Sequence, residues 1–194
     1  MRASHDHILT SHAGSLPRPD ELMQAWAQAA GEAIDQDAFA ERLRAAVTEV
    51  VRRQRDLGVG VPGDGEFGKP MAQRVNYGSW WRYSWSRLGG LDPGGPSLYE
   101  MEARRSSPGH VVLTSFGDRR DRIRFAAAYG DPESGITTGP RPPAPICTAP
   151  IHYAGHDAIK ADITNFKAAL RAAGVEEGFM TAVAPGSAAR IGNS

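Results

Sequence analysis

The chain has 194 residues, of which 22 are basic, 22 are acidic and 41% are hydrophobic. This length and composition predict a folded protein of one or two domains and exclude an intrinsically disordered chain. A formal net charge of zero gives no general attraction to phosphate backbones or anionic lipids, so we expect neither nucleic acid nor a membrane as a partner.

The chain opens with a predicted strand, a loop and a helix. Residues 8–10 are a short apolar run that predicts a strand, and Gly14 and Pro17 place the residues after it on a loop. Pro19 then opens a helix that has acidic residues in its first turn and apolar residues on one face. Proline and acidic residues both favour the N-terminus of a helix.

A longer helix and a second strand follow. Apolar residues recur at three- and four-residue steps before Gly58, which predicts a helix of about five turns. Asp35 or Asp37 can cap its start, and Gly58 can supply the left-handed residue that ends it. Residues 59–61 predict a short strand that leads into the glycine-rich turn of residues 63–68.

Residues 69–145 interrupt this alternation, and we interpret them as an excursion from the main fold. An aromatic stretch at 77–85 either packs the excursion onto the fold or stacks on a planar ligand, and packing is the favoured interpretation. Residues 111–116 and 122–129 predict the two strands of a hairpin. Residues 132–145 contain five prolines and predict a loop.

The alternation then resumes with a strand at 146–149, a helix at 156–173 that ends at Gly174, and a strand at 179–183. These elements predict an α/β fold with about four βα units. A closed (β/α)8 barrel takes about 250 residues, so we expect a partial TIM-type barrel. We expect one apparently truncated domain over residues 1–194, although a small doubly wound domain is an alternative.

Two overlapping G-x-G-x-x-G strings occur at residues 58–63 and 63–68; the first starts at a helix stop, and the second contains Asp64 and Glu66. Both acids would lie where a dinucleotide binds its pyrophosphate, and this repulsion argues against a dinucleotide site. Loops after strand C-termini form the active face of a parallel barrel, where Glu66 could bind an ammonium group or act as a base. A solvated turn acid is an equally good interpretation of Glu66.

Two loose sets of metal-ligating residues occur, but neither has a recognised ligand spacing, so we favour structural or solvated roles for both. The sets are His5, His7 and His12 near the start, and Cys147, His152 and His156. Cys147 is the only cysteine, which excludes an internal disulfide framework. No signal peptide or apolar run of about 18 residues is visible, so we expect a cytoplasmic protein.

Several ordered segments together resemble the cobalamin-independent methionine synthase family, and more closely its shorter, single-barrel relatives. They are residues 8–19 (ILTSHAGSLPRP), 50–54 (VVRRQ), 63–70 (GDGEFGKP), 147–155 (CTAPIHYAG), 162–170 and 179–186. The resemblance implies a TIM-type barrel in which zinc activates a thiol for methyl transfer. The thiol is typically homocysteine, and the donor is a methyltetrahydrofolate.

The family's substrate contacts map onto four residues of this chain. The resemblance implies that Gly14 and Ser15, with Ala13 beside them, hold the carboxylate of the amino-acid substrate. It implies that Glu66 holds the amino group. Backbone donors and a hydroxyl suit a carboxylate, and a carboxylate suits an ammonium group.

The family's zinc ligands, however, are a His-x-Cys pair, a further acid and a later cysteine, and this chain contains no His-x-Cys. Cys147 matches no ligand position, so we expect no zinc to be bound by this chain alone and no methyl transfer by it in isolation. The chain resembles the N-terminal half of such an enzyme, and its partner is expected to be a small thiol or amino acid.

Two other functions remain open. Exposed strand edges of a half barrel could bind a second copy or a separate C-terminal half, which would make the chain a non-catalytic assembly module. Alternatively, the chain is a small-molecule binder that uses Ser15 and Glu66, with the aromatic stretch as a lid.

Overall fold

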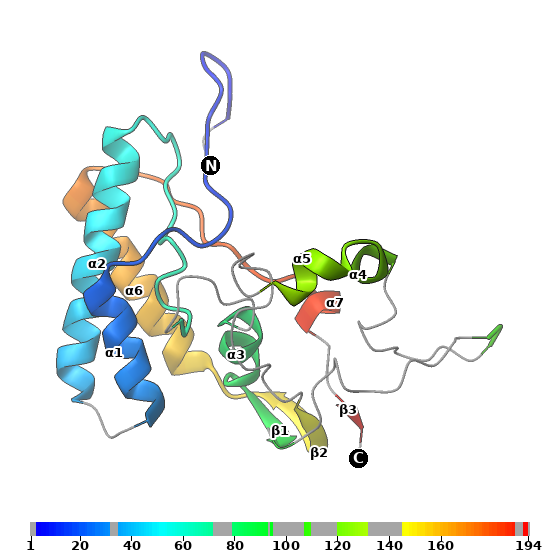
Figure 1. Ribbon diagram of the computed structural model, residues 1–194. Coiled ribbons are helices and arrows are strands. Elements are labelled where there is room, and N and C mark those ends of the chain that lie inside the picture. The colour runs from blue at the N-terminus through cyan, green and yellow to red at the C-terminus, as the bar shows by residue number, and fades with distance from the viewer. Residues whose placement is uncertain are drawn as a thin grey trace. The chain divides into compact units, whose positions relative to one another are not determined.

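The computed structural model has two compact units, and each is built from two parts of the chain (Figure 1). The first unit comprises Met1–Arg74 and Gly155–Ala184, and the second comprises Val75–Ala154 and Pro185–Ser194. The structure describes residues 3–31, 35–71, 79–92, 94, 107–109, 120–131, 145–188 and 192–193. These residues form a mixed α/β structure that is mostly helical.

The elements of the first unit are α1 (Asp20–Gly31), α2 (Gln36–Asp56) and α6 (His156–Ala173). Those of the second unit are α3 (Ser79–Trp85), β1 (Leu88–Asp92), α4 (Arg120–Arg124), α5 (Ala126–Gly130), β2 (Ile146–Tyr153), α7 (Pro185–Ala188) and β3 (Gly192–Asn193). The prediction of a single domain with an excursion at 69–145 stays a prediction.

The long helices of the first unit form where the sequence predicts them, because their end signals are local. The Asp35 side chain accepts hydrogen bonds from the backbone amides of Asp37 and Ala38, so Asp35 is the residue that caps α2. Gly58 has a φ of 84° just after α2, and Gly174 has a φ of 66° at the end of α6. Both predicted glycine stops are confirmed.

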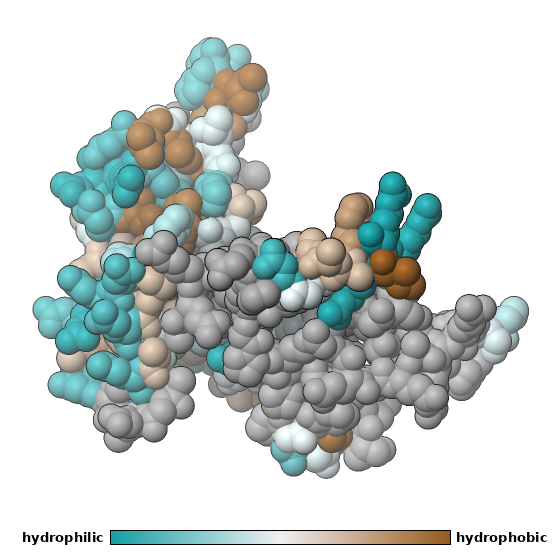
Figure 2. Space-filling model, viewed as in Figure 1, coloured by the Kyte–Doolittle hydropathy of each residue, from teal (hydrophilic) through white to brown (hydrophobic). Residues whose placement is uncertain are grey.

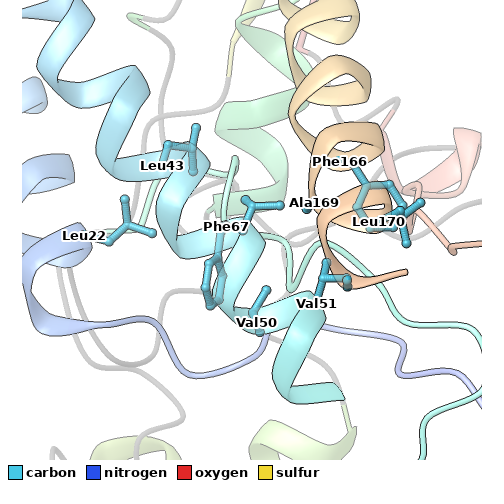
Figure 3. Close-up of a cluster of buried hydrophobic side chains, with 10 residues drawn as sticks. Leu22, Leu43, Val50, Val51, Phe67, Phe166, Ala169 and Leu170 are labelled. Carbon is cyan, nitrogen blue, oxygen red and sulfur yellow. The ribbon is translucent and has the colours of Figure 1, made fainter. Parts of the chain in front are cut away.

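The core of the first unit lies where α2 packs against α6, with α1 beside α2 (Figures 1 and 3). Val51 on α2 and Ala169 on α6 are completely buried, and Leu22 on α1 is 2% exposed. The buried cluster consists of Leu22, Leu43, Val47, Val50, Val51, Phe67, Phe166, Ala169, Leu170 and Ala173. Removing this apolar surface from water is the main force that holds the three helices together.

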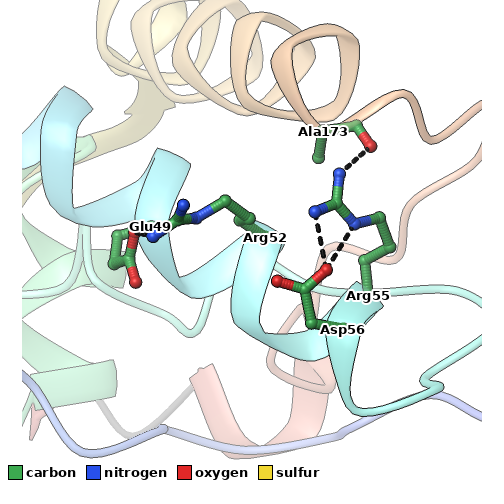
Figure 4. A network of polar contacts seen from close by, with 5 residues as sticks. All are labelled: Glu49, Arg52, Arg55, Asp56 and Ala173. Atoms are coloured by element: carbon green, nitrogen blue, oxygen red, sulfur yellow. Dashed lines mark hydrogen bonds and ion pairs between the residues drawn. The ribbon is translucent and has the colours of Figure 1, made fainter.

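A hydrogen bond links the C-terminal ends of α2 and α6 (Figure 4). The Arg55 guanidinium donates to the Ala173 carbonyl oxygen at 2.6 Å, and it also bonds the Asp56 carboxylate. A cation at the last carbonyls of α6 satisfies one of them and opposes the negative end of the helix dipole. Glu49 and Arg52 form an exposed pair one turn earlier, which contributes only about 0.3 kcal/mol.

The three strands predicted for the first unit do not form, and this part of the prediction is wrong. Residues 8–10, 59–61 and 179–183 lie outside the assigned strands. Single contacts remain: the Val61 amide donates to the Thr10 carbonyl, and Gly63 forms one parallel bridge with Phe179. Glycine at 60 and 63 weakens a ladder, and proline at 62 has no N–H to donate to one.

The side chain of Gln54 bonds backbone groups of Gly63 that a neighbouring strand would otherwise pair. Its side-chain amide donates to the Gly63 carbonyl oxygen at 2.8 Å and accepts from the Gly63 amide at 3.0 Å. It also donates to the carbonyl oxygen of Val50. A buried glutamine, 5% exposed, thereby satisfies both backbone groups of Gly63 at the start of the glycine-rich turn.

In the second unit, β2 pairs antiparallel with β1 and parallel with the two-residue β3. The strand predicted at 146–149 exists and continues to Tyr153. Its main partner, β1, is antiparallel, and the pairing is interrupted by a register shift between Gly89 and Leu91. Because this partner is antiparallel, β2 does not extend a parallel βα series. Among the described residues there is neither a barrel nor a βα repeat.

Other elements of the second unit differ from the prediction. Residues 122–129, predicted as a strand, are helical in α4 and α5, where an alanine run favours helix. The aromatic stretch forms α3, in which Trp81 and Trp85 stack one turn apart, with ring centroids separated by 5.9 Å. The hairpin partner predicted at 111–116 and most of the loop predicted at 132–145 lie outside the described residues.

The surface of the helices in the first unit is mostly hydrophilic on the face that Figure 2 presents. Within the part of the chain that the structure describes, no helix is both long enough and apolar enough to cross a bilayer. Single apolar side chains are nevertheless exposed, among them Ile8, which is 84% exposed, and Leu57, which is 74% exposed.

Candidate functional site

The candidate site is built around a tight turn that presents Glu66. Gly65 has a φ of 67° and Glu66 a φ of 60°, so two consecutive residues adopt the left-handed conformation. This conformation costs a residue with a Cβ roughly 1–2 kcal/mol. The Glu66 amide donates to the Asp64 carboxylate at 2.9 Å, and the Glu66 carbonyl accepts from the Lys69 amide at 3.1 Å. These bonds hold the turn on both sides of Glu66.

Ser15 and Glu66 are 51 residues apart in sequence, and the structure brings their side chains together. The Ser15 hydroxyl donates to Oε2 of Glu66 at 2.6 Å. Glu66 is only 1% exposed, and its other oxygen, Oε1, is buried with no hydrogen-bond partner among the described residues. Gly14 precedes Ser15 with a φ of 110°, and Ala13 is exposed. A buried acceptor without a donor is unfavourable, so a ligand that donates to Oε1 is favoured.

Arg18 crosses the base of the turn. Its Nη2 donates to the carbonyl oxygens of both Glu66 and Lys69, and its Nη1 donates to the sulfur of Met71. The guanidinium also lies 5.6 Å from the centre of the Phe67 ring. Burial lowers the pKa of Arg18 to about 10, because the charged form has lost water, and the carboxylates of Glu66 and Asp64 oppose that shift.

Lys69 places a second cation beside the turn. It is 3% exposed, and burial lowers the pKa of its amine, while the carboxylates of Asp64, Glu66 and Asp162 act in the opposite direction. Asp162 belongs to α6, and its carboxylate lies 3.1 Å from the position that a Cβ on Gly68 would occupy. Arg18, Lys69 and Glu66 are buried, and the half-buried Asp64 and Asp162 complete a group of two cations and three carboxylates.

Contacts from Leu16 and from Trp26 on α1 fix the turn in the first unit. The Leu16 amide donates to the Gly65 carbonyl at 3.1 Å, and the Trp26 indole donates to the Phe67 carbonyl at 3.3 Å. At Gly65 an added Cβ would lie 2.9 Å from the Phe67 ring, so both the left-handed backbone and the close ring require glycine there. The Phe67 ring itself is part of the core.

The residues with metal-ligating side chains do not fit a zinc centre. Among the described residues, no group of three or more histidine, cysteine, aspartate or glutamate side chains could hold a metal ion. Cys147 lies on β2, where its thiol contacts the Ala149 carbonyl, and Nδ1 of His152 lies 3.2 Å from the Pro150 carbonyl oxygen. The zinc of the complete family enzymes, which we do not expect this chain to bind alone, has no fitting set of ligands among these residues.

The sequence alone missed Arg18 and Lys69 as parts of this site. Buried lysine and arginine are rare, so both are expected at the surface from their charge. The signal that could have identified them is their context: Arg18 stands between two prolines, and Lys69 directly follows the turn and precedes another proline. A charged residue held in such restricted backbone is a candidate for a fixed role.

No protein-family model matches the chain, and no curated protein matches it.

Proposed function

We propose that the Ser15–Glu66 site binds the amino group of a small amino acid, and that the chain acts in a thiol methyltransferase of the cobalamin-independent methionine synthase type. The expected substrate is homocysteine or a similar thiol, and the donor is a methyltetrahydrofolate type of molecule. The observation that carries the proposal is Oε1 of Glu66, a buried carboxylate oxygen with no hydrogen-bond partner among the described residues. An ammonium group would donate to it.

The charge balance of the site favours a cationic group in the ligand. Among the described residues that act on one another here, the carboxylates of Asp64, Glu66 and Asp162 outnumber the two cations, Arg18 and Lys69, which gives an excess of one negative charge. A substrate ammonium would balance this charge in a place with little water. Ser15 is exposed and its hydroxyl bonds the Glu66 carboxylate, so we propose that the ligand approaches from the Ser15 side. The Ser15 hydroxyl proton is used by Glu66, so we propose that the backbone amides of Gly14 and Ser15 bind the substrate carboxylate, in keeping with the resemblance.

For these 194 residues we propose substrate anchoring without methyl transfer in isolation. Zinc would supply thiol activation in the family, but the residues present do not form its ligand set. The contacts of Val61 with Thr10 and of Gly63 with Phe179 place three segments side by side, and we propose that they correspond to adjacent strands of a partial TIM-type barrel. A cytoplasmic location belongs to the same proposal.

Calorimetry with matched ligands tests the proposal. We expect L-homocysteine to bind, and the Glu66→Gln variant to bind it at least about tenfold more weakly. The analogue 4-sulfanylbutanoic acid lacks the amino group, so its affinity should be the same for both proteins. Glu49→Gln removes an exposed carboxylate of the same unit and is the control for charge. Equal affinity of Glu66→Gln and the unchanged protein for L-homocysteine would overturn the proposal.

A second candidate role, assembly with another copy or a separate chain, is favoured by β2. Among the described strands, β3 pairs only with Ile146 and Cys147, so the rest of that edge of β2 has no strand partner. Ile151 on this segment is 47% exposed. An open strand edge with apolar side chains is a ready site for another strand.

A further inference from the structure

We infer that Arg18 is a positioning residue for Glu66: its guanidinium holds the backbone of the turn in the left-handed conformation that aims the carboxylate at Ser15 and at a ligand amine. The inference rests on the proposed function, because a ligand amine is part of it. It concerns a residue that neither the sequence pattern nor the resemblance assigns to the site.

The contacts of Arg18 are placed to control the backbone of Glu66. Nη2 bonds the carbonyl oxygen of Glu66 and, at 3.1 Å, that of Lys69, so one nitrogen joins both ends of a helical-type turn. The same Glu66 carbonyl accepts from the Lys69 amide at 3.1 Å. Rotation of Glu66 to an ordinary negative φ would move this carbonyl and break these bonds. The backbone of Glu66 is thus held in the left-handed conformation by two donors to its carbonyl oxygen, Nη2 of Arg18 and the amide of Lys69.

Burial and the neighbouring chain make Arg18 rigid enough for this role. The residue is 6% exposed, its Nη1 bonds the Met71 sulfur, and its guanidinium lies near the Phe67 ring. Pro17 and Pro19 restrict the backbone on either side of it. Planar geometry and several donors allow one guanidinium to bind three acceptors together, which the single ammonium of lysine cannot reproduce in the same arrangement.

Two substitutions separate positioning from charge. Arg18→Met removes the donors and the charge but keeps an apolar stem for the Phe67 contact. Arg18→Lys keeps the charge and loses the planar group. If Arg18 acts by fixing the carbonyl of Glu66, both variants should behave alike. If it acts through charge alone, Arg18→Lys should behave like the unchanged protein. Leu170→Ala, whose side chain lies against Gly178, is the control for a general loss of stability.

The first readout needs no ligand. Amide hydrogen exchange followed by NMR reports on the bond from the Lys69 amide to the Glu66 carbonyl. We expect this amide to exchange at least about tenfold faster in Arg18→Met and Arg18→Lys, relative to the amide of Val51 in the core of the same protein. In Leu170→Ala this ratio should be unchanged. An unchanged ratio in both Arg18 variants would overturn the inference.

The second readout is affinity for L-homocysteine in a double-mutant cycle. Arg18→Met should weaken binding by about tenfold in the protein with Glu66, but should have no further effect in the Glu66→Gln background, because Arg18 acts through Glu66. Equal effects in both backgrounds would overturn positioning. If the unchanged protein binds no L-homocysteine, the proposed function fails, and the exchange ratio still decides whether Arg18 fixes the Glu66 backbone.

Discussion

Lys69 carries a charge into an environment that disfavours it, and this has a measurable consequence for stability. Burial lowers the pKa of its amine below the ordinary value of 10.5, so the unfolded chain holds this proton more tightly than the folded protein does. Stability therefore rises with pH while the amine titrates, up to the pKa of the unfolded chain. Below this range, the protonated amine carries the full cost of its burial.

We predict that the unchanged protein gains stability relative to Lys69→Met as the pH rises from neutral to about pH 10. Urea unfolding at a series of pH values measures the difference between the two proteins, in which the effects of all other titrating groups cancel. Lys160→Met removes an exposed lysine of α6 and is the matched control. A stability of the unchanged protein, relative to that of Lys69→Met, that stays constant or falls as the pH rises would contradict the prediction.

Residues of the site show which features a sequence can reveal. Glu66 was singled out by its place in the glycine-rich turn and Ser15 through the resemblance, and the structure joins them by a 2.6 Å hydrogen bond. Their role in binding stays a prediction. The burial of Arg18 and Lys69 was missed, because it depends in part on groups distant in sequence, Glu66 for Arg18 and Asp162 for Lys69. The left-handed φ of Glu66 also has no local signal, since only glycine favours it.

At the scale of elements, the segment after α6 packs so closely on it that one position has no room for a side chain. A Cβ on Gly178 would lie 2.4 Å from Cζ of Phe166 and 2.9 Å from Cδ1 of Leu170. Both residues belong to the core, where neighbouring atoms leave little room to move. The core of the first unit therefore depends on a glycine that lies outside any helix or strand.

Gly178→Ala should lower the free energy of unfolding by about 1–3 kcal/mol, because an added methyl group overpacks the core. Urea denaturation measures this loss. Adding Phe166→Leu to Gly178→Ala should restore part of it, since the smaller side chain makes room for the methyl group. Gly130→Ala, where no atom lies within 4 Å of the added Cβ, is the control. Equal stability of Gly178→Ala and the unchanged protein would show that the core adjusts freely.

Helices were predicted better than strands for a physical reason. The limits of α2 and α6 depend on caps, glycine stops and apolar spacing, all of which lie within the helix and its flanks. A strand is stable only when another segment pairs with it, and no local signal identifies that partner. Residues 59–61 have a strand-like composition, but only isolated hydrogen bonds join them to neighbouring segments among the described residues. By contrast, β1 contains two glycines and still pairs with β2.

At the scale of the whole molecule, the open edge of β2 leads to a prediction about oligomeric state. We expect the chain to self-associate, and Ile151→Lys to weaken this association by about tenfold, because a charge on a strand edge opposes pairing. Sedimentation velocity over a range of concentrations measures the association. Ile123→Lys changes an exposed isoleucine on α4, which is 69% exposed, and is the control. A monomer at every concentration would rule out this mode of assembly.

The discontinuous first unit has a consequence for the order of events during synthesis. Its core needs α2 from one part of the chain and α6 from another, with the second unit's main segment translated between them. Folding units generally close when their last contacting segment has emerged from the ribosome. Glu66 is therefore made early, whereas Asp162, whose carboxylate lies beside Gly68, follows only with α6, so a nascent chain arrested before His156 would carry the Ser15–Glu66 pair without the Asp162 carboxylate.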